Sequence, residues 1–225
     1  QKLLKQLGSF FFFKISYNHR QQKTLKNHTP MNTILNRNIY LIKEHVGMFK
    51  ASNNFDIFNP ENGSQLMTCR EPNLGFFTKL FRFTEYKRMT PFQVIISDNQ
   101  GKKIISVKRG FTVFRSDVEI FDENDKLIGV FKQKFFSFGG KFEIHDANDR
   151  HLCTLQGKWT GWDFKFTKDN KEIAHVSKKW SGIGKEFFTS ADNYILEIFN
   201  HVPQDDNLRP LIVASVMCID MVFKE

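Results

Sequence analysis

The residues best suited to binding chemistry are lysines that stand close together in two stretches of the sequence. A basic side chain near a membrane surface contributes about 1 kcal/mol of attraction to anionic lipid headgroups, and tryptophan favours the membrane–water interface. The candidate residues for binding anionic headgroups are therefore Lys132, Lys134, Lys178, Lys179, Trp180 and Lys185. The same lysines would also suit the solvated outer face of a β-sheet, where lysine protects strand edges from aggregation, and this alternative stays open.

The sequence carries no recognisable catalytic constellation. Its seven histidines show neither an HExxH motif nor a paired metal-ligand spacing. The run Gly182-Ile-Gly184-Lys185 resembles part of a phosphate-binding loop, but its first glycine has the wrong spacing and no Ser or Thr follows the lysine. No Gly-x-Ser-x-Gly elbow occurs either. We therefore expect a non-enzymatic protein with no catalytic residues and no cofactor.

The formal net charge of +9 is unevenly distributed along the 225 residues. Residues 1–30 contain six Lys or Arg and no Asp or Glu, so the rest of the chain has a net charge of only +3. This balance argues against nucleic acid as a partner. The cysteines Cys69, Cys153 and Cys218 lie far apart and lack metal-ligand spacing, which indicates buried thiols in a reducing, cytoplasmic compartment.

Residues 1–30 also lack the pattern of the remaining sequence. Lysine interrupts their apolar run and no cleavage site follows, which does not fit a secretory signal. Patterned sequence begins at Met31, directly after Pro30. We interpret residues 1–30 as a disordered leader or as upstream sequence that is not native, and residues 31–225 as a single domain. A basic membrane-binding arm is the alternative for the leader.

A hairpin pattern repeats from residue 92 to residue 176. Apolar β-type segments alternate with clusters of Asp, Asn and Gly, and Asp98, Asp122 and Asp146 recur every 24 residues. Such residues tolerate the positive φ angles of tight turns between antiparallel strands. Serial hairpins form a meander, and a meander that closes removes its exposed edges. The pattern predicts a mainly β protein with a closed antiparallel barrel of about twelve strands, whereas a propeller needs about 40 residues per repeat.

The segment 208–223 is predicted to be a helix that is apolar on every side, since only Ser215 and Asp220 are polar between Leu211 and Phe223. A surface helix has a single apolar stripe, so this helix must be enclosed. It is shorter than the roughly 20 apolar residues that span a bilayer. We expect it to fill the barrel, with a transmembrane helix as the alternative. Its expected core residues are Leu211, Val213, Val216, Met217, Ile219 and Met221.

The stretch Lys178-Lys-Trp-Ser-Gly-Ile-Gly-Lys-Glu-Phe-Phe-Thr-Ser-Ala-Asp-Asn193, followed by the apolar helix, resembles the C-terminal part of the phospholipid scramblases. Cys69-Arg-Glu-Pro-Asn and Thr90-Pro-Phe-Gln-Val fit the same group, and the likeness covers roughly residues 50–225. This family is related to the Tubby C-terminal domain and to the LURP-one-related proteins. The resemblance implies a twelve-stranded barrel around a hydrophobic C-terminal helix.

The sequence departs from the animal scramblases in two respects. It contains neither their Pro-rich N-terminal region nor their palmitoylated cysteine cluster. Their calcium segment begins with an acidic residue where Ser190 stands, although Asp192 and Asn193 match. One carboxylate and one amide are few ligands for calcium, which takes six to eight oxygens. We therefore expect a fold that does not need calcium, and a simple turn is the alternative interpretation of Asp192-Asn193.

Two functional hypotheses follow from the sequence. In the first, the protein binds anionic phospholipid at the cytosolic membrane face, and the resemblance extends this role to phospholipid scrambling. In the second, it is a soluble regulatory or ligand-binding protein of the LURP-one-related kind with no membrane role.

Overall fold

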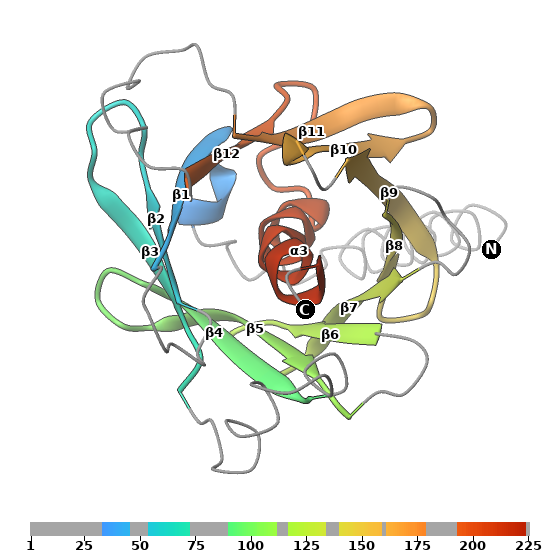
Figure 1. Ribbon diagram of the computed structural model, residues 1–225, viewed down its shortest axis with the longest axis horizontal. Coiled ribbons are helices and arrows are strands. Elements are labelled where there is room, and N and C mark those ends of the chain that lie inside the picture. The colour runs from blue at the N-terminus through green and yellow to red at the C-terminus, as the bar shows by residue number, and fades with distance from the viewer. Residues whose placement is uncertain are drawn as a thin grey trace, which may run out of the picture. The chain divides into compact units, whose positions relative to one another are not determined.

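The computed structural model describes residues 33–45, 54–72, 90–111, 117–133, 140–158, 161–178 and 193–223, all within the unit Asn32–Glu225. These residues form a closed antiparallel barrel of twelve strands around one helix, as Figure 1 shows. The barrel and its enclosed helix confirm the predicted fold class. The proposed leader, residues 1–30, lies outside the described residues.

The elements follow one another along the chain almost as they do around the barrel. They are η1 (Thr33–Asn36), β1 (Ile39–Glu44), β2 (Phe55–Phe58), β3 (Gln65–Arg70), β4 (Phe92–Asp98), β5 (Lys103–Arg109), β6 (Asp117–Phe121), β7 (Leu127–Gln133), β8 (Lys141–Asp146), β9 (His151–Lys158), β10 (Asp163–Lys168), β11 (Lys171–Ser177), β12 (Asn193–Ile198) and α3 (Leu208–Phe223).

Closure of the barrel depends on one pair of strands that are distant in sequence. Every strand from β2 to β12 pairs with its neighbour in the chain, and β1 pairs with both β2 and β12. The closing register runs from Ile39 opposite Glu197 to Lys43 opposite Asn193. The meander therefore ends without a free edge, which removes the usual site of edge-to-edge aggregation.

Most strands alternate buried and more exposed residues, as a sheet with one covered face requires. In β10, Phe164 and Phe166 are buried whereas Asp163 and Lys165 are exposed. The strands β1 and β12 differ because successive residues in each are buried. On β12, the ring of Tyr194 stacks on that of Trp162 with the centroids 4.8 Å apart. Trp162 therefore packs against the closing strand.

The three hairpin turns that recur every 24 residues have the same hydrogen-bond geometry. In each, Oδ1 of the first aspartate accepts from the backbone N–H groups two and four residues later, at 2.8 to 2.9 Å. The residue three positions after that aspartate has a positive φ of 82°, 59° and 63° at Gly101, Asp125 and Asp149 respectively. The spacing in the sequence therefore reflects a repeated local structure, in which an aspartate side chain organises the turn.

The helix α3 lies inside the ring of strands (Figure 1) and every residue from Leu211 to Ile219 is buried. The six expected core residues of this helix are each at most 2% exposed. Ser215 avoids an unpaired hydroxyl by donating to the carbonyl oxygen of Leu211 at 2.6 Å. The barrel wall lies so close to α3 that a Cβ atom added to Gly129 of β7 would lie 2.7 Å from the Leu211 side chain. Among the described residues, no helix is long and apolar enough to cross a membrane.

The first turn of α3 contains a guanidinium, that of Arg209, which is fully buried. It donates to the carbonyl oxygens of Arg37, Val202 and Pro203 and to Oδ1 of Asn38, at 2.7 to 2.8 Å. Arg209 therefore ties the start of the helix to the segment between η1 and β1. All four acceptors are neutral, and no carboxylate of the described residues forms an ion pair with this guanidinium.

We predict that Met217→Asp prevents folding, because it places an unpaired charge in the middle of the enclosed helix. Burial of one such apolar side chain is worth about 1.5–3 kcal/mol, so the helix contributes on the scale of the net stability of a domain, about 5–15 kcal/mol. Circular dichroism in detergent-free buffer should show no cooperative melting for this variant.

Two further variants make this test decisive. Met217→Leu conserves volume and should cost less than about 1.5 kcal/mol, so it should still melt cooperatively. Deletion of residues 208–225 should behave like Met217→Asp. A soluble β protein that melts cooperatively without these residues would contradict an enclosed core helix.

Candidate functional site

The antiparallel topology gives the barrel two unlike ends. At one, which we call the turn end, the hairpins β2–β3, β4–β5, β6–β7, β8–β9 and β10–β11 are joined by two to six residues. Because Arg209 binds Arg37 and Asn38, the start of α3 lies at this end too. At the other, which we call the connection end, the joining segments have four to 21 residues.

The two ends also differ in the charge of the segments that join their strands. The five turns at the turn end contain three Lys or Arg and six Asp or Glu. In the sequence, the six segments that join strands at the connection end contain ten Lys or Arg and four Asp or Glu, and most of these residues lie outside the described ranges. Neighbouring strands run in opposite directions, so successive joining segments alternate between the two ends. The separation of charge is therefore spread over many segments and does not come from a single strand.

The candidate lysine that the structure describes at the connection end is Lys178, directly after β11. Its ammonium nitrogen lies 5.1 Å from the centroid of the Trp162 ring, a cation–π geometry. Its backbone N–H donates to the Trp162 carbonyl oxygen at 3.3 Å. The side chain is half-buried, so Lys178 is positioned by its neighbours and still reaches solvent.

Lys132 differs from Lys178, because its charge is already compensated. Its ammonium group contacts the carboxylate of Asp149 in the β8–β9 turn, and hydrogen bonding to Lys132 lowers the pKa of Asp149. The side chain of Lys132 is 20% exposed. Sequence spacing placed this lysine on a strand face but gave no sign of its partner, and we do not assign it to a lipid-binding surface.

The other candidates for lipid binding, Lys134, Lys179, Trp180 and Lys185, lie outside the described residues, as does Asp192 of the calcium segment. Asn193 is described: it is the first residue of β12, is buried, and pairs with Lys43 of β1. It therefore belongs to a strand, and the alternative interpretation as part of a simple turn is wrong for Asn193. Within the described ranges, no group of three or more His, Cys, Asp or Glu is placed to hold a metal.

One apolar side chain near the connection end is strongly exposed to solvent. Phe111 follows β5 and is 69% exposed. Arg109, two residues before Phe111, is buried. Its guanidinium lies 4.6 Å from the centroid of the Phe92 ring and donates one hydrogen bond to the Thr90 carbonyl oxygen at 2.8 Å. A single exposed apolar side chain is common on protein surfaces, so the feature to note is the position of Phe111 next to the basic joining segments.

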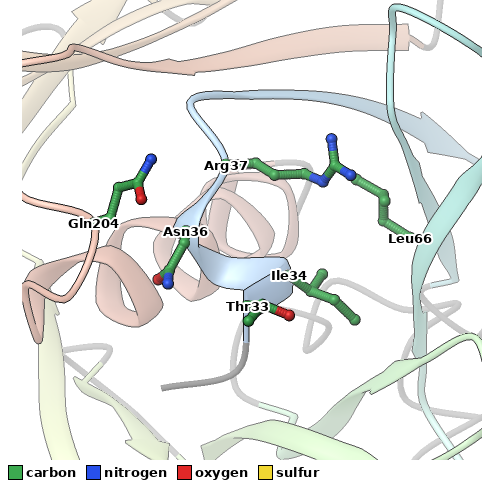
Figure 2. Close-up of a pocket in the computed structure, with 6 residues that line it drawn as sticks. All are labelled: Thr33, Ile34, Asn36, Arg37, Leu66 and Gln204. Carbon is green, nitrogen blue, oxygen red and sulfur yellow. The ribbon is translucent and has the colours of Figure 1, made fainter. Parts of the chain in front are cut away.

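A shallow pocket of about 370 Å³ lies at the turn end, beside η1. Its lining comes from η1, the residue after η1, the start of β3 and the segment before α3. Figure 2 shows Arg37 extending toward Leu66, with Asn36 and Gln204 on the other side of η1. The lining residues are Thr33, Ile34, Asn36, Arg37, Leu66 and Gln204. Sequence reasoning missed this pocket, because its residues are brought together only by barrel closure.

The fold and its unequal ends define a class of protein, namely a twelve-stranded barrel that encloses its C-terminal helix. A family model described as Scramblase matches residues 14–225, so the chain belongs to the Scramblase family. No curated protein matches the chain. A similar solved structure, of a protein from Arabidopsis thaliana, has 14% sequence identity and a TM-score of 0.49, and the likeness covers 85% of this chain and 96% of that one. Because the family match includes residues 14–30, the separation of a leader stays a prediction.

We predict that Cys69, Cys153 and Cys218 do not react with thiol reagents while the protein is folded. All three side chains are buried. Burial raises the pKa of Cys153 to about 12 and also raises the pKa of Cys218. The reactive thiolate is therefore scarce at neutral pH. A thiol titration at pH 8 should detect no thiol in the native protein and three in denaturant. Rapid reaction of any of them under native conditions would contradict the burial of these side chains.

Proposed function

We propose that this protein is a non-enzymatic, membrane-associated protein that binds anionic phospholipid surfaces through the connection end. The observation that carries the proposal is the separation of charge between the two ends of the barrel. An anionic membrane attracts the basic end and repels the acidic turns, so the charge fixes both binding and orientation. Family membership supports the same choice of ligand. The cytosolic face of the membrane is the surface that we propose, because anionic lipids are enriched there.

Lys178 is the described side chain to which we assign a headgroup contact, since it is basic, half-buried and held against an indole ring. The sequence places Lys134, Lys179, Trp180 and Lys185 in segments that join strands at the same end, and they complete the proposed basic surface. Phe111 supplies an apolar group that can enter the interface between headgroups and acyl chains. Neither calcium nor a cofactor has a part in this proposal.

The proposal covers lipid binding and stops short of lipid transport. A scramblase needs a path along which headgroups cross the apolar layer, because a polar group in hydrocarbon is costly. The barrel interior is filled by α3, whose residues from Leu211 to Ile219 are all buried. The described part of the barrel therefore favours a protein that docks on a lipid surface.

We predict that Lys178→Gln weakens binding to phosphatidylserine vesicles about fivefold, the equivalent of about 1 kcal/mol for one basic residue near a membrane. Sedimentation with vesicles at low salt measures this, with phosphatidylcholine vesicles as the uncharged comparison. Lys171→Gln is the matched control, because Lys171 is exposed and begins the same strand, β11, at the turn end. Wild-type protein that stays in the supernatant, or equal losses for the two variants, would contradict the proposed function.

We predict that Phe111 enters the membrane interface when the protein docks. The native thiols are buried, so a thiol-reactive environment-sensitive fluorophore on Phe111→Cys should label that position alone. Its emission should shift to the blue with phosphatidylserine vesicles. The control is Asn148→Cys in the exposed β8–β9 turn, where no shift is expected. A shift at position 148, or none at position 111 while the protein sediments with vesicles, would contradict this orientation.

A further inference from the structure

We propose that the pocket at the turn end binds a small, soluble phosphate ester, with the Arg37 guanidinium as the group that contacts the phosphate. This site is separate from the basic surface at the connection end. The phosphate site itself rests on different residues at the opposite end of the barrel, and only the choice of a soluble source rests on the proposed membrane function.

The first observation is an uncompensated cation in a polar pocket. Arg37 is exposed, and among the described residues its guanidinium forms no ion pair. Arginine at the turn end is not generally free in this way, because Arg150 binds the carboxylate of Asp146 at 2.6 Å. A planar guanidinium can donate two parallel hydrogen bonds to a phosphate, which makes arginine well suited to this ligand.

The second observation is a buried cation next to the same pocket. The guanidinium of Arg209, in α3, donates to the backbone carbonyl oxygen of Arg37 at 2.8 Å, so the helix start is tied to the segment that carries the Arg37 side chain. Burial lowers the pKa of Arg209, which indicates that the positive charge lies in a poorly solvated environment. The acidic side chain with an electrostatic effect on Arg209 is Asp206. Its carboxylate accepts from the N–H of Leu208 at 2.9 Å and so caps α3.

These charges favour an anion in the pocket over a neutral or positive ligand. Arg209 has only neutral hydrogen-bond acceptors, and interactions with a buried charge are stronger than those at the surface because the local dielectric constant is low. An anion held by Arg37 would therefore also be stabilised by the positive field of Arg209. The negative charge of Asp206 reduces this field. Asp206 caps α3 and is not a lining residue, so the pocket lining contains no carboxylate.

The remaining lining residues suit the organic part of a phosphate ester. Thr33, Asn36 and Gln204 supply hydroxyl and amide groups for ligand hydroxyls, and Leu66 supplies an apolar wall. Oδ1 of Asn36 is buried, and no donor among the described residues bonds to it. A small rotation toward a ligand hydroxyl would remove the cost of this unsatisfied acceptor. A volume of about 370 Å³ accommodates a phosphorylated small polyol.

Phosphate chemistry could come from a soluble ester or from a lipid headgroup, and the position of the pocket favours the soluble source. The turn end lies opposite the end that we propose to face the membrane. It also has the acidic turns, which an anionic bilayer repels. A molecule dissolved in water can reach this pocket whether or not the connection end is bound to a membrane. A headgroup fixed in a bilayer could reach it only if the barrel docked with its turn end toward the membrane.

The test is binding of glycerol 3-phosphate to the full chain, measured by titration calorimetry and by amide chemical-shift changes. We expect shifts confined to η1, the start of β3 and residues near Gln204. Arg37→Gln should weaken binding at least tenfold. Arg150→Gln, the control at the same end, should leave the affinity within about twofold of the wild-type value. Glycerol at the same concentration should produce no shifts, because it lacks the phosphate.

Vesicles that contain phosphatidic acid form the second arm and distinguish the two sources. For a soluble ligand, the vesicles should not displace glycerol 3-phosphate, and Arg37→Gln should sediment with them like the wild type. Absence of glycerol 3-phosphate binding, unchanged affinity of Arg37→Gln, or an equal loss in Arg150→Gln would overturn the proposal. Displacement by the vesicles would overturn the soluble source. None of these results depends on Lys178→Gln, so this inference and the membrane function can fail separately.

Discussion

A helix that is apolar on every side needs a wall on every side, and this constraint determines the rest of the structure. An open sheet would leave part of α3 in water, whereas the closed barrel surrounds it. The strands in turn need α3, because among the described elements it is the long helix against which their buried faces can pack. The absence of a side chain on Gly129 lets the wall approach Leu211. The hydrogen bonds of Arg209 fix where along the barrel axis the helix begins.

The same topology separates two kinds of surface. In an up-and-down barrel, alternate connections lie at opposite ends, so short turns and long segments can evolve independently. Here the turns are organised by aspartate side chains and are acidic, whereas the longer segments are basic. The chain belongs to the Scramblase family. The difference in charge between the two ends of the barrel indicates which end an anionic surface would attract. In the proposed function, a lipid surface meets the connection end, and the pocket at η1 stays open to the solvent.

Sequence patterns predicted the features that depend on local or periodic signals. The 24-residue spacing of Asp98, Asp122 and Asp146 predicted the hairpins, because each turn is organised by hydrogen bonds within five residues. The bounds of α3 followed from its long apolar run, in which only Ser215 and Asp220 are polar between Leu211 and Phe223. The ion pair of Lys132 could not be predicted in this way, because Asp149 approaches it from another hairpin. The same holds for Arg209 and Asn38, which are 171 residues apart in the sequence. An arginine between Leu208 and Pro210, at the start of an all-apolar helix, was the available signal for a buried charge.

The order of the elements has a consequence for synthesis on the ribosome. The strand β1 emerges first but pairs with β12, and α3 follows all twelve strands. At about 5–20 residues per second, the nascent strands wait on the order of ten to forty seconds before their core exists. Domains that fold as they emerge can bury apolar residues progressively, whereas this barrel cannot. Its inward-facing residues therefore stay without their central helix until α3 has left the ribosome.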